Sequence, residues 1–237
     1  MKAISILHSG GPDSTLAALY ALERADQVHL LTFHSYVMGQ VSKHRKVVAE
    51  LQEKFGAGRV ISHEEGIDKF FNAFYFKNLG HHIWTFRTFY VPWICGACKL
   101  AMHSRTIAYN LNHKISTTYD GAHQESASVF PDQADPYMNV LKDLYLSYGM
   151  TYDSPIYGVP ETDVETEKYG LRTTRGTKKE HVIFSTQHTC LIGLLVHAHA
   201  RFYYLPFRGK NRAKILAGKF LSLRVRECKE FMPDHPL

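Results

Sequence analysis

A short segment near the N-terminus has the residue types of a phosphate-binding loop. It lies between an apolar run, residues 3–7, and a helix-like stretch, residues 14–24. Its sequence, hereafter the phosphate cradle, is Ser9-Gly10-Gly11-Pro12-Asp13-Ser14-Thr15. Glycines let the backbone approach an anion closely and adopt positive φ. The free N–H groups and the dipole of a helix N-terminus favour negative charge, and the hydroxyl groups add donors. The segment therefore predicts a site for a nucleotide phosphate, against the alternative of a plain N-capped helix after a glycine turn.

The phosphate cradle differs from two common nucleotide motifs. It lacks the lysine of the Walker A loop and the third glycine of the dinucleotide fingerprint. It resembles the SGGxDS signature of the PP-loop ATP pyrophosphatases. This resemblance implies that ATP is cleaved between its α- and β-phosphates and that a substrate is adenylated. It assigns the ATP phosphates, with Mg²⁺, to Ser9, Gly10, Gly11, Asp13, Ser14 and Thr15, and gives Asp13 and Ser14 catalytic roles.

The cysteines form a second candidate site. Cys95 and Cys98 form a CxxC pair just before an expected helix, residues 99–111, and Cys190 opens another expected helix. Two thiolates at this spacing can bind one metal ion. The pair alone leaves a redox couple, a zinc site and an iron–sulfur cluster open. A closed Zn²⁺ site that adds Cys228 is a further alternative, although Cys228 can equally be a small buried residue.

The order of the cysteines is similar to one PP-loop branch, the tRNA 2-thiocytidine and 2-thiouridine synthetases. Members of that branch carry CxxC before strand four and a third cysteine roughly ninety residues later. The resemblance implies that Cys95, Cys98 and Cys190 hold a [4Fe–4S] cluster with one iron open to sulfide. It also implies a sulfide donor and tRNA as partners.

The same branch has a GHNxDD segment beside the nucleotide, and residues 120–125 resemble it. Gly121 matches the glycine and would border the nucleotide, while Glu125 matches one carboxylate and would act on the substrate. The second acidic position is Ser126 here. At the end of the second expected strand, PP-loop proteins surround the adenine, so Phe33 and His34 are expected to bind it.

A second resemblance points to another PP-loop family, 7-cyano-7-deazaguanine synthase. It rests on residues 32–40, 131–132 and 154–156. That family binds zinc through a cysteine cluster near the C-terminus, and only Cys228 lies beyond Cys190 in this chain. We therefore expect this resemblance to be limited to the nucleotide half.

The elements that must position these residues alternate along the first half of the chain. Apolar runs predict strands, and 3.6-residue periodicity predicts helices. The expected strands are Ala3–Leu7, Val28–Phe33, Arg59–Ser62 and Ile115–Tyr119, and the expected helices are Ser14–Arg24, Lys43–Phe55, Ile67–Phe76 and Lys99–Leu111. This order predicts an α/β fold, a doubly wound parallel sheet of PP-loop type with ligands at the carboxyl ends of its strands.

The second half is less regular. We expect helices at residues 136–148 and 190–199, a strand at 182–185 and a mobile loop at 165–179. We assign residues 1–200 to the PP-loop ATP-binding and catalytic domain. Residues 201–237 are assigned to a short basic helical C-terminal extension with interleaved aromatic residues.

Composition limits the classes of function. The 237 residues carry a formal charge of +6 and a pI of about 9.0, which favours an anionic partner. Basic and aromatic residues after position 200 suit RNA, so the extension predicts tRNA contacts, against an ordinary solvated helix face. No apolar window is long enough for a membrane span and no signal peptide is evident, so we expect no membrane partner and a cytoplasmic location. The aromatic segment 70–76 predicts core packing or a homodimer contact.

Together these features predict an ATP-dependent, AMP- and pyrophosphate-forming enzyme of the sulfurtransferase type. It would adenylate a nucleobase carbonyl and insert sulfur through the cluster, with tRNA as the expected substrate. Three alternatives stay open. They are a PP-loop synthase that delivers nitrogen to a small deazapurine-like substrate, an iron–sulfur desulfurase of thiolated bases, and a module that only senses ATP.

Overall fold

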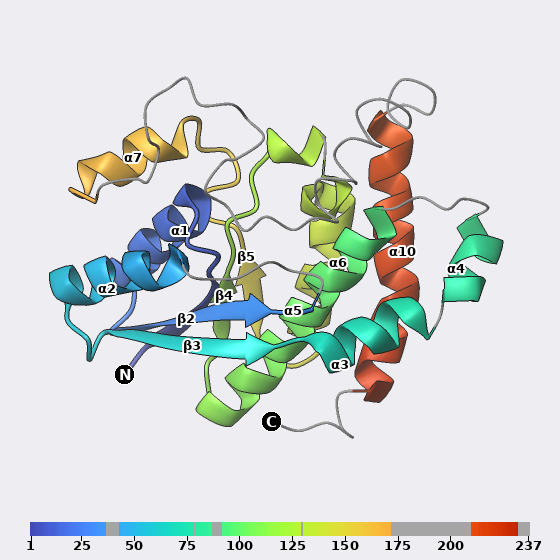
Figure 1. Cartoon of the computed structure of the whole chain (residues 1–237), viewed down its shortest axis with the longest axis horizontal. Coiled ribbons are helices and arrows are strands. Elements are labelled where there is room, and N and C mark those ends of the chain that lie inside the picture. The colour runs from blue at the N-terminus through green and yellow to red at the C-terminus, as the bar shows by residue number, and fades with distance from the viewer. Residues whose placement is uncertain (37–42, 78, 87–91, 129, 172–209, 232–237) are drawn as a thin grey trace.

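The structure is a computed structural model that describes residues 1–36, 43–77, 79–86, 92–128, 130–171 and 210–231 (Figure 1). The strands are β1 (Ala3–Leu7), β2 (Gln27–His34), β3 (Val60–Gly66), β4 (Thr117–Tyr119) and β5 (Thr151–Asp153). The helices are α1 (Pro12–Leu22), α2 (Lys43–Phe55), α3 (Asp68–Phe71), α4 (Leu79–Phe86), α5 (Pro92–His113), α6 (Asp135–Leu146), α7 (Thr162–Lys168) and α10 (Lys210–Phe231). A π-helical segment and two 3-10 turns complete them: η1 (Asn72–Phe76), η2 (Ser126–Ser128) and η3 (Pro131–Gln133).

The strands form one parallel sheet in the order β3-β2-β1-β4-β5. The central strand, β1, is an almost continuous aliphatic run, as expected for a parallel strand covered on both faces. The chain moves outward in one direction through β2 and β3, then returns past β1 to β4 and β5. The order therefore reverses between β1 and β4, where open α/β sheets bind ligands. The predicted fold class is confirmed, and the phosphate cradle follows β1 at this switch point.

Helices cover both faces of the sheet. α1 and α2 pack on one face through a cluster that includes Ile4, Ile6 and Leu30, and α7 lies against α1. α3, α5, α6 and α10 pack on the other face, where Leu31 and Phe33 point into a second cluster. Figure 1 shows the two layers on opposite sides of the strands.

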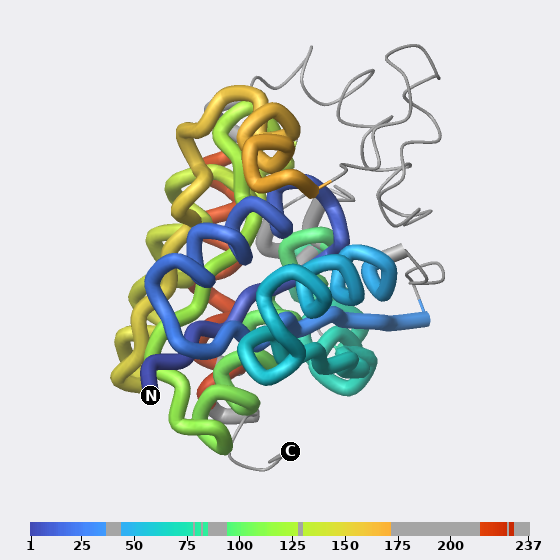
Figure 2. The backbone as a smooth tube through the Cα atoms, turned by 90° about the vertical axis from the view of Figure 1, so that its left-hand side faces the viewer, coloured from blue at the N-terminus to red at the C-terminus, as the bar shows by residue number. Residues whose placement is uncertain are grey.

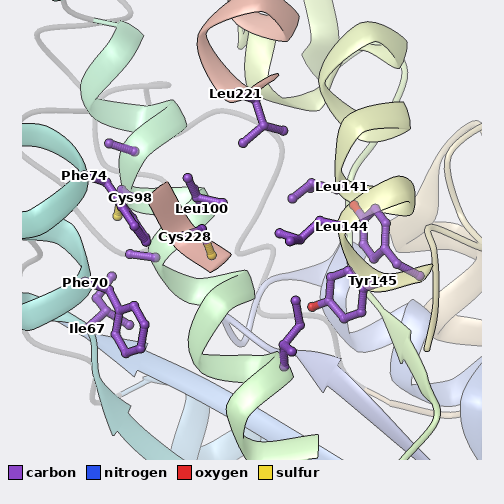
Figure 3. Close-up of a cluster of buried hydrophobic side chains, with 14 of the residues drawn as sticks. Ile67, Phe70, Phe74, Cys98, Leu100, Leu141, Leu144, Tyr145, Leu221 and Cys228 are labelled. Carbon is purple, nitrogen blue, oxygen red and sulfur yellow. The ribbon is translucent and has the colours of Figure 1, made fainter. Parts of the chain in front are cut away.

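Helix α10 is part of the second layer. It contacts α6 and α5, and both views show it running alongside them (Figures 1 and 2). Its buried residues Phe220, Leu221 and Cys228 belong to the same cluster as Leu141 and Tyr145 of α6. The close-up in Figure 3 shows Leu221 and Cys228 among the residues of this cluster. The predicted domain boundary near residue 200 falls outside the described ranges and stays a prediction.

Several expected elements have the predicted bounds, and others do not. β1 and α2 begin and end where the sequence predicts. The predicted loop at 165–179 is wrong for its first residues, which are helical as far as Lys168, and its residues beyond 171 lie outside the described part. The buried positions of α7 are two threonines, Thr162 and Thr166, while Val164 is exposed, so this helix lacks an apolar stripe. The strand at 182–185 and the helix at 190–199 also lie outside the described residues.

None of the helices in the described ranges is long and apolar enough to cross a membrane.

Candidate active site

The phosphate cradle is a preformed loop held by its own hydroxyl groups. The Ser9 amide and hydroxyl both lie 3.2 Å from Ser14 Oγ, and the Gly11 amide donates to Ser9 Oγ at 3.3 Å. Gly11 is the N-cap of α1, and its carbonyl accepts hydrogen bonds from Ser14 Oγ and Thr15 Oγ1. These bonds hold the loop at the N-terminus of α1, where the first N–H groups of a helix have no partner within the helix and can bind an anion.

Two glycines allow other segments to touch this loop. Gly10 has a φ of +77°, and a Cβ there would lie 2.7 Å from Cα of His44 in α2. Gly121 follows β4, and a Cβ on it would lie 2.7 Å from the Ser14 nitrogen. The structure thus brings Gly121, expected beside the nucleotide, against the first turn of α1.

The other predicted nucleotide residues lie at the strand ends in different environments. Asp13 accepts a hydrogen bond from Thr162 Oγ1 at 2.5 Å, so its carboxylate ties α1 to α7. Phe33 is 6% exposed and packs in the core, which leaves little of its ring for a base, whereas His34 is exposed. Glu125 is exposed in the segment after β4. The roles of these residues in binding and catalysis stay predictions.

A buried polar network lies next to the cradle, and sequence reasoning missed it. Asp120, which directly follows β4 and precedes Gly121, pairs with Lys99 of α5, whose Nζ lies 3.1 Å from Oδ2. The same oxygen accepts a hydrogen bond from Tyr152 at 2.7 Å, and Oδ1 accepts one from the Ala122 amide. Burial alone would raise the pKa of Asp120, but Lys99 and these donors lower it below its usual value. The network therefore fixes an ion pair beside Ser14.

Two further titratable groups surround Lys99. Burial and then the charge of Lys99 lower the pKa of His103 to about 3, so this histidine is neutral. Burial raises the pKa of Asp132 although Lys99 opposes it. Asp132 Oδ1 is buried and has no hydrogen-bond partner in the part of the chain that the structure describes. Perturbed groups of this kind concentrate at functional sites.

The signal for this network was weak in the sequence. Lys99 and Asp120 lie on different elements, and only folding brings them together. A lysine within a largely apolar helix segment and an aspartate directly after a strand were the available clues.

The CxxC pair lies within α5, so the prediction that it precedes the helix is wrong. The helix begins at Pro92, and Cys95 is half-buried while Cys98 is buried. Gly96 is a poor helix former, but its missing side chain lets Phe220 pack closely on the helix, since a Cβ there would lie only 3.3 Å from the Phe220 ring. The Gly96 carbonyl also accepts a hydrogen bond from the Tyr137 hydroxyl at 2.6 Å. Tertiary packing thus extends the helix over the pair.

Of the remaining two cysteines, the structure describes only Cys228. Cys190 lies outside the described residues. Cys228 is fully buried in α10, and its Sγ lies 2.9 Å from the Ser104 hydroxyl. Burial raises the pKa of its thiol to about 11, which favours a neutral, small core residue over a metal ligand. Among the described residues, no three histidine, cysteine or acidic side chains gather as a metal site.

Comparison with known families decides the class of the chain. Residues 2–193 match the family described as queuosine biosynthesis protein QueC. The chain belongs to the QueC family. The match continues through α6 and β5. The expectation that the resemblance to 7-cyano-7-deazaguanine synthase is limited to the nucleotide half is therefore wrong. QueC proteins are PP-loop proteins, so the family and the SGGxDS cradle agree. No curated protein matches the chain.

This QueC family member is similar to several solved structures at low identity. A 4-thiouridine synthetase in complex with RNA and ATP is 18% identical with a TM-score of 0.50, over 90% of this chain and 53% of that one. A predicted tRNA methyltransferase subunit from Methanocaldococcus jannaschii is 15% identical with a TM-score of 0.46, over 70% and 75%. The U34-tRNA thiolase NcsA from Methanococcus maripaludis, with its [4Fe-4S] cluster, is 13% identical with a TM-score of 0.44, over 93% and 72%. The chain spans about half the length of the synthetase.

Proposed function

We propose that this protein is an adenylating enzyme that activates a carboxyl oxygen of a small deazapurine. The preformed phosphate cradle carries the proposal, because its glycines, hydroxyl groups and helix N-terminus suit a triphosphate. A synthetase of the same fold was solved with ATP. Membership of the QueC family supports the acceptor, because its members act in queuosine biosynthesis.

The proposed chemistry begins with ATP bound at the cradle. An acceptor oxygen attacks the α-phosphorus of ATP, a new P–O bond forms, and the bond to the β-phosphate breaks to release pyrophosphate. A nitrogen nucleophile then attacks the activated carbon, and AMP leaves with the acceptor oxygen. The N–H groups of α1 would hold the phosphates. The Ser14 hydroxyl, which donates to the Gly11 carbonyl in this structure, would turn its proton to a phosphate oxygen when ATP binds.

The Lys99–Asp120 pair would line the part of this site in which the acceptor lies. Its charges are fixed by Tyr152 and the Ala122 amide, so they need little reorganisation during the reaction. The buried Oδ1 of Asp132 offers a partner to an N–H group of the acceptor. Glu125 is proposed to act on the acceptor from the exposed segment after β4.

Mg²⁺ suits the oxygen donors of this site. Asp13 is the carboxylate of the cradle, and magnesium is commonly shared between one or two carboxylates and the phosphates of a nucleotide. When bound, the ion would neutralise charge on the departing pyrophosphate.

A second candidate function is thiolation of a tRNA base. The placement of Cys95 and Cys98 three residues apart in α5 favours it, because residues at this spacing lie on one helix face. With Cys190 they would hold a [4Fe–4S] cluster, which supplies an open iron for sulfide from a donor; Zn²⁺ is the alternative metal. Exposed Lys219, Arg226 and Lys229 on α10 would contact RNA, whereas Arg224 is buried.

One experiment separates these functions. Pyrophosphate release is measured with ATP and either a carboxylated deazapurine or unmodified tRNA, using protein purified without oxygen. We expect the deazapurine to stimulate release, and Ser14→Ala to abolish it. Ser222→Ala, a serine of α10 that bonds only within its helix among the contacts described, serves as the matched control and should behave as wild type. Stimulation by tRNA alone, with about four irons per chain, would favour thiolation. Release that neither acceptor stimulates would contradict both.

A further inference from the structure

We propose that His44, held by Glu64, donates a hydrogen bond to a phosphate oxygen of ATP and forms a second wall of the phosphate cradle. The proposal deepens and rests on the proposed function. Neither the resemblance to PP-loop enzymes nor the sequence pattern of the cradle assigns a role to this residue.

The first observation is contact between α2 and the cradle. A Cβ on Gly10 would lie 2.7 Å from Cα, 2.9 Å from Cβ and 3.1 Å from the backbone nitrogen of His44. His44 is the second residue of α2, so the first turn of α2 lies against the loop. The N-termini of two helices, α1 and α2, therefore meet at Gly10. Figure 1 shows both helices beginning on the same side of the sheet.

The second observation is the state of the His44 side chain. The residue is fully buried, and its Nε2 lies 3.0 Å from Glu64 Oε1 of β3. Nδ1 is also buried and has no hydrogen-bond partner in the described structure. Buried polar atoms without partners are rare in folded proteins, and each calls for an explanation. The His44 Cβ would lie 2.9 Å from a Cβ built on Gly10, and Nδ1 is only two bonds from that His44 Cβ, so the unpartnered nitrogen belongs to the part of α2 that faces the loop.

The third observation is the anchor of the imidazole. Arg45 donates to both carboxylate oxygens of Glu64, at 2.9 and 3.0 Å. These hydrogen bonds lower the pKa of Glu64 to about 2. The hydrogen bond from His44 acts in the same direction, and partial burial of Glu64 opposes both. An ionised Glu64 can only accept a hydrogen bond, so Nε2–H donates to it, and a second proton taken up by the ring would lie on Nδ1. Nδ1–H can then donate to an anion in the loop, and a phosphate is the anion that the adjacent N–H groups of α1 suit.

The ligand chemistry follows from this arrangement. A neutral nucleoside has no anionic oxygen to accept a hydrogen bond from Nδ1–H, whereas ATP and its leaving group, pyrophosphate, have several. His44 would therefore strengthen binding of the phosphate chain and leave binding of the nucleoside part unchanged.

The test uses the geometry of two amide side chains. In His44→Gln the amide nitrogen reaches the position of Nε2 and keeps the contact with Glu64 but removes Nδ1. In His44→Asn the amide nitrogen is two bonds from Cβ, as Nδ1 is, so it retains a donor toward Gly10. Lys46→Ala removes an exposed charge from the same helix turn and is the matched control.

Calorimetric titration of the full chain with ATP, inorganic pyrophosphate and adenosine gives the result. We expect His44→Gln to weaken ATP and pyrophosphate about tenfold, the low end for a charge-assisted hydrogen bond, with adenosine unchanged. His44→Asn should recover part of the loss, and Lys46→Ala should match wild type.

Equal weakening of adenosine, or unchanged pyrophosphate affinity in His44→Gln, would overturn the role of His44. Should His44→Gln fail to fold, Glu64→Gln carries the test, because it retains an acceptor and removes the charge. Weaker pyrophosphate binding in that variant supports the proposal, and unchanged binding overturns it. A wild-type protein that binds neither ATP nor pyrophosphate would instead contradict the proposed function itself.

Discussion

Replacing Gly121 by alanine should displace the phosphate cradle, although Gly121 is not itself a residue of the cradle. The added Cβ would lie 2.7 Å from the Ser14 nitrogen, 3.0 Å from the Asp13 carbonyl carbon and 3.0 Å from the Ser14 Cα, where ordinary contact begins at 3.4 Å. All three atoms are backbone, so no side chain can rotate away. The first turn of α1 must move by several tenths of an ångström.

The size of the effect follows from that displacement. Overpacking of this kind costs about 1–3 kcal/mol of folding stability. The displaced groups are the N–H donors proposed to hold the phosphates, and a misplacement of about 1 Å can cost on the order of a hundredfold in rate. We therefore expect kcat/KM for ATP to fall at least about tenfold, because the shift is smaller than 1 Å.

Thermal unfolding and pyrophosphate release measure the two effects separately. Gly158→Ala is the control, because a Cβ there would meet nothing within 4 Å, and it should leave both quantities near wild type. A Gly121→Ala protein with wild-type melting temperature and ATP kinetics would refute the close approach. A lower melting temperature with unchanged kinetics would show that Gly121 is needed for packing alone.

Three further predictions concern the core beside the site. Asp120→Asn leaves Lys99 buried without its partner and should cost about 3–5 kcal/mol in urea unfolding at neutral pH. The pKa of Asp120 is lower in the folded protein than in the unfolded chain, where it is about 3.9. The ionised carboxylate therefore stabilises the folded state above about pH 3.9, and this stabilisation is lost as the pH falls through the folded-state pKa. An acid titration of stability should show this loss in wild type and not in the asparagine variant. Cys228→Ala should retain all bound metal in elemental analysis, because burial keeps its thiol neutral; loss of metal would contradict this. Tyr137→Phe should cost about 1 kcal/mol in the same urea assay, because it removes the hydrogen bond to the Gly96 carbonyl; unchanged stability would argue against that bond.

The phosphate cradle could be predicted from the sequence because it is local. An aliphatic strand, two glycines and a helix with Pro12 at its first turn are contiguous, so the hydrogen bonds between Ser9, Gly11 and Ser14 need no distant partner. The alternation of strands and helices also predicted the parallel sheet, because buried parallel strands are continuous apolar runs.

The rest of the site depends on contacts between distant segments. Lys99 and Asp120 pair across two elements, and the contact of His44 with Gly10 joins residues 34 positions apart in the chain. Helix α5 begins before the CxxC pair because Tyr137 and Phe220 pack on Gly96, which overrides the low helix propensity of glycine. Strand β5 has only Tyr152 buried, so no alternating pattern marked it.

The central claim is that an oxygen of the acceptor attacks the α-phosphorus of ATP at the phosphate cradle. The most direct measurement supplies ATP, an ammonium salt as the nitrogen nucleophile and a deazapurine whose carboxylate is labelled with ¹⁸O. The label in the nucleotide product is determined by mass spectrometry, with Ser14→Ala as the inactive control. The proposed chemistry predicts AMP that carries one ¹⁸O atom, because AMP leaves with the acceptor oxygen. Unlabelled AMP, or ADP as the nucleotide product, would contradict it.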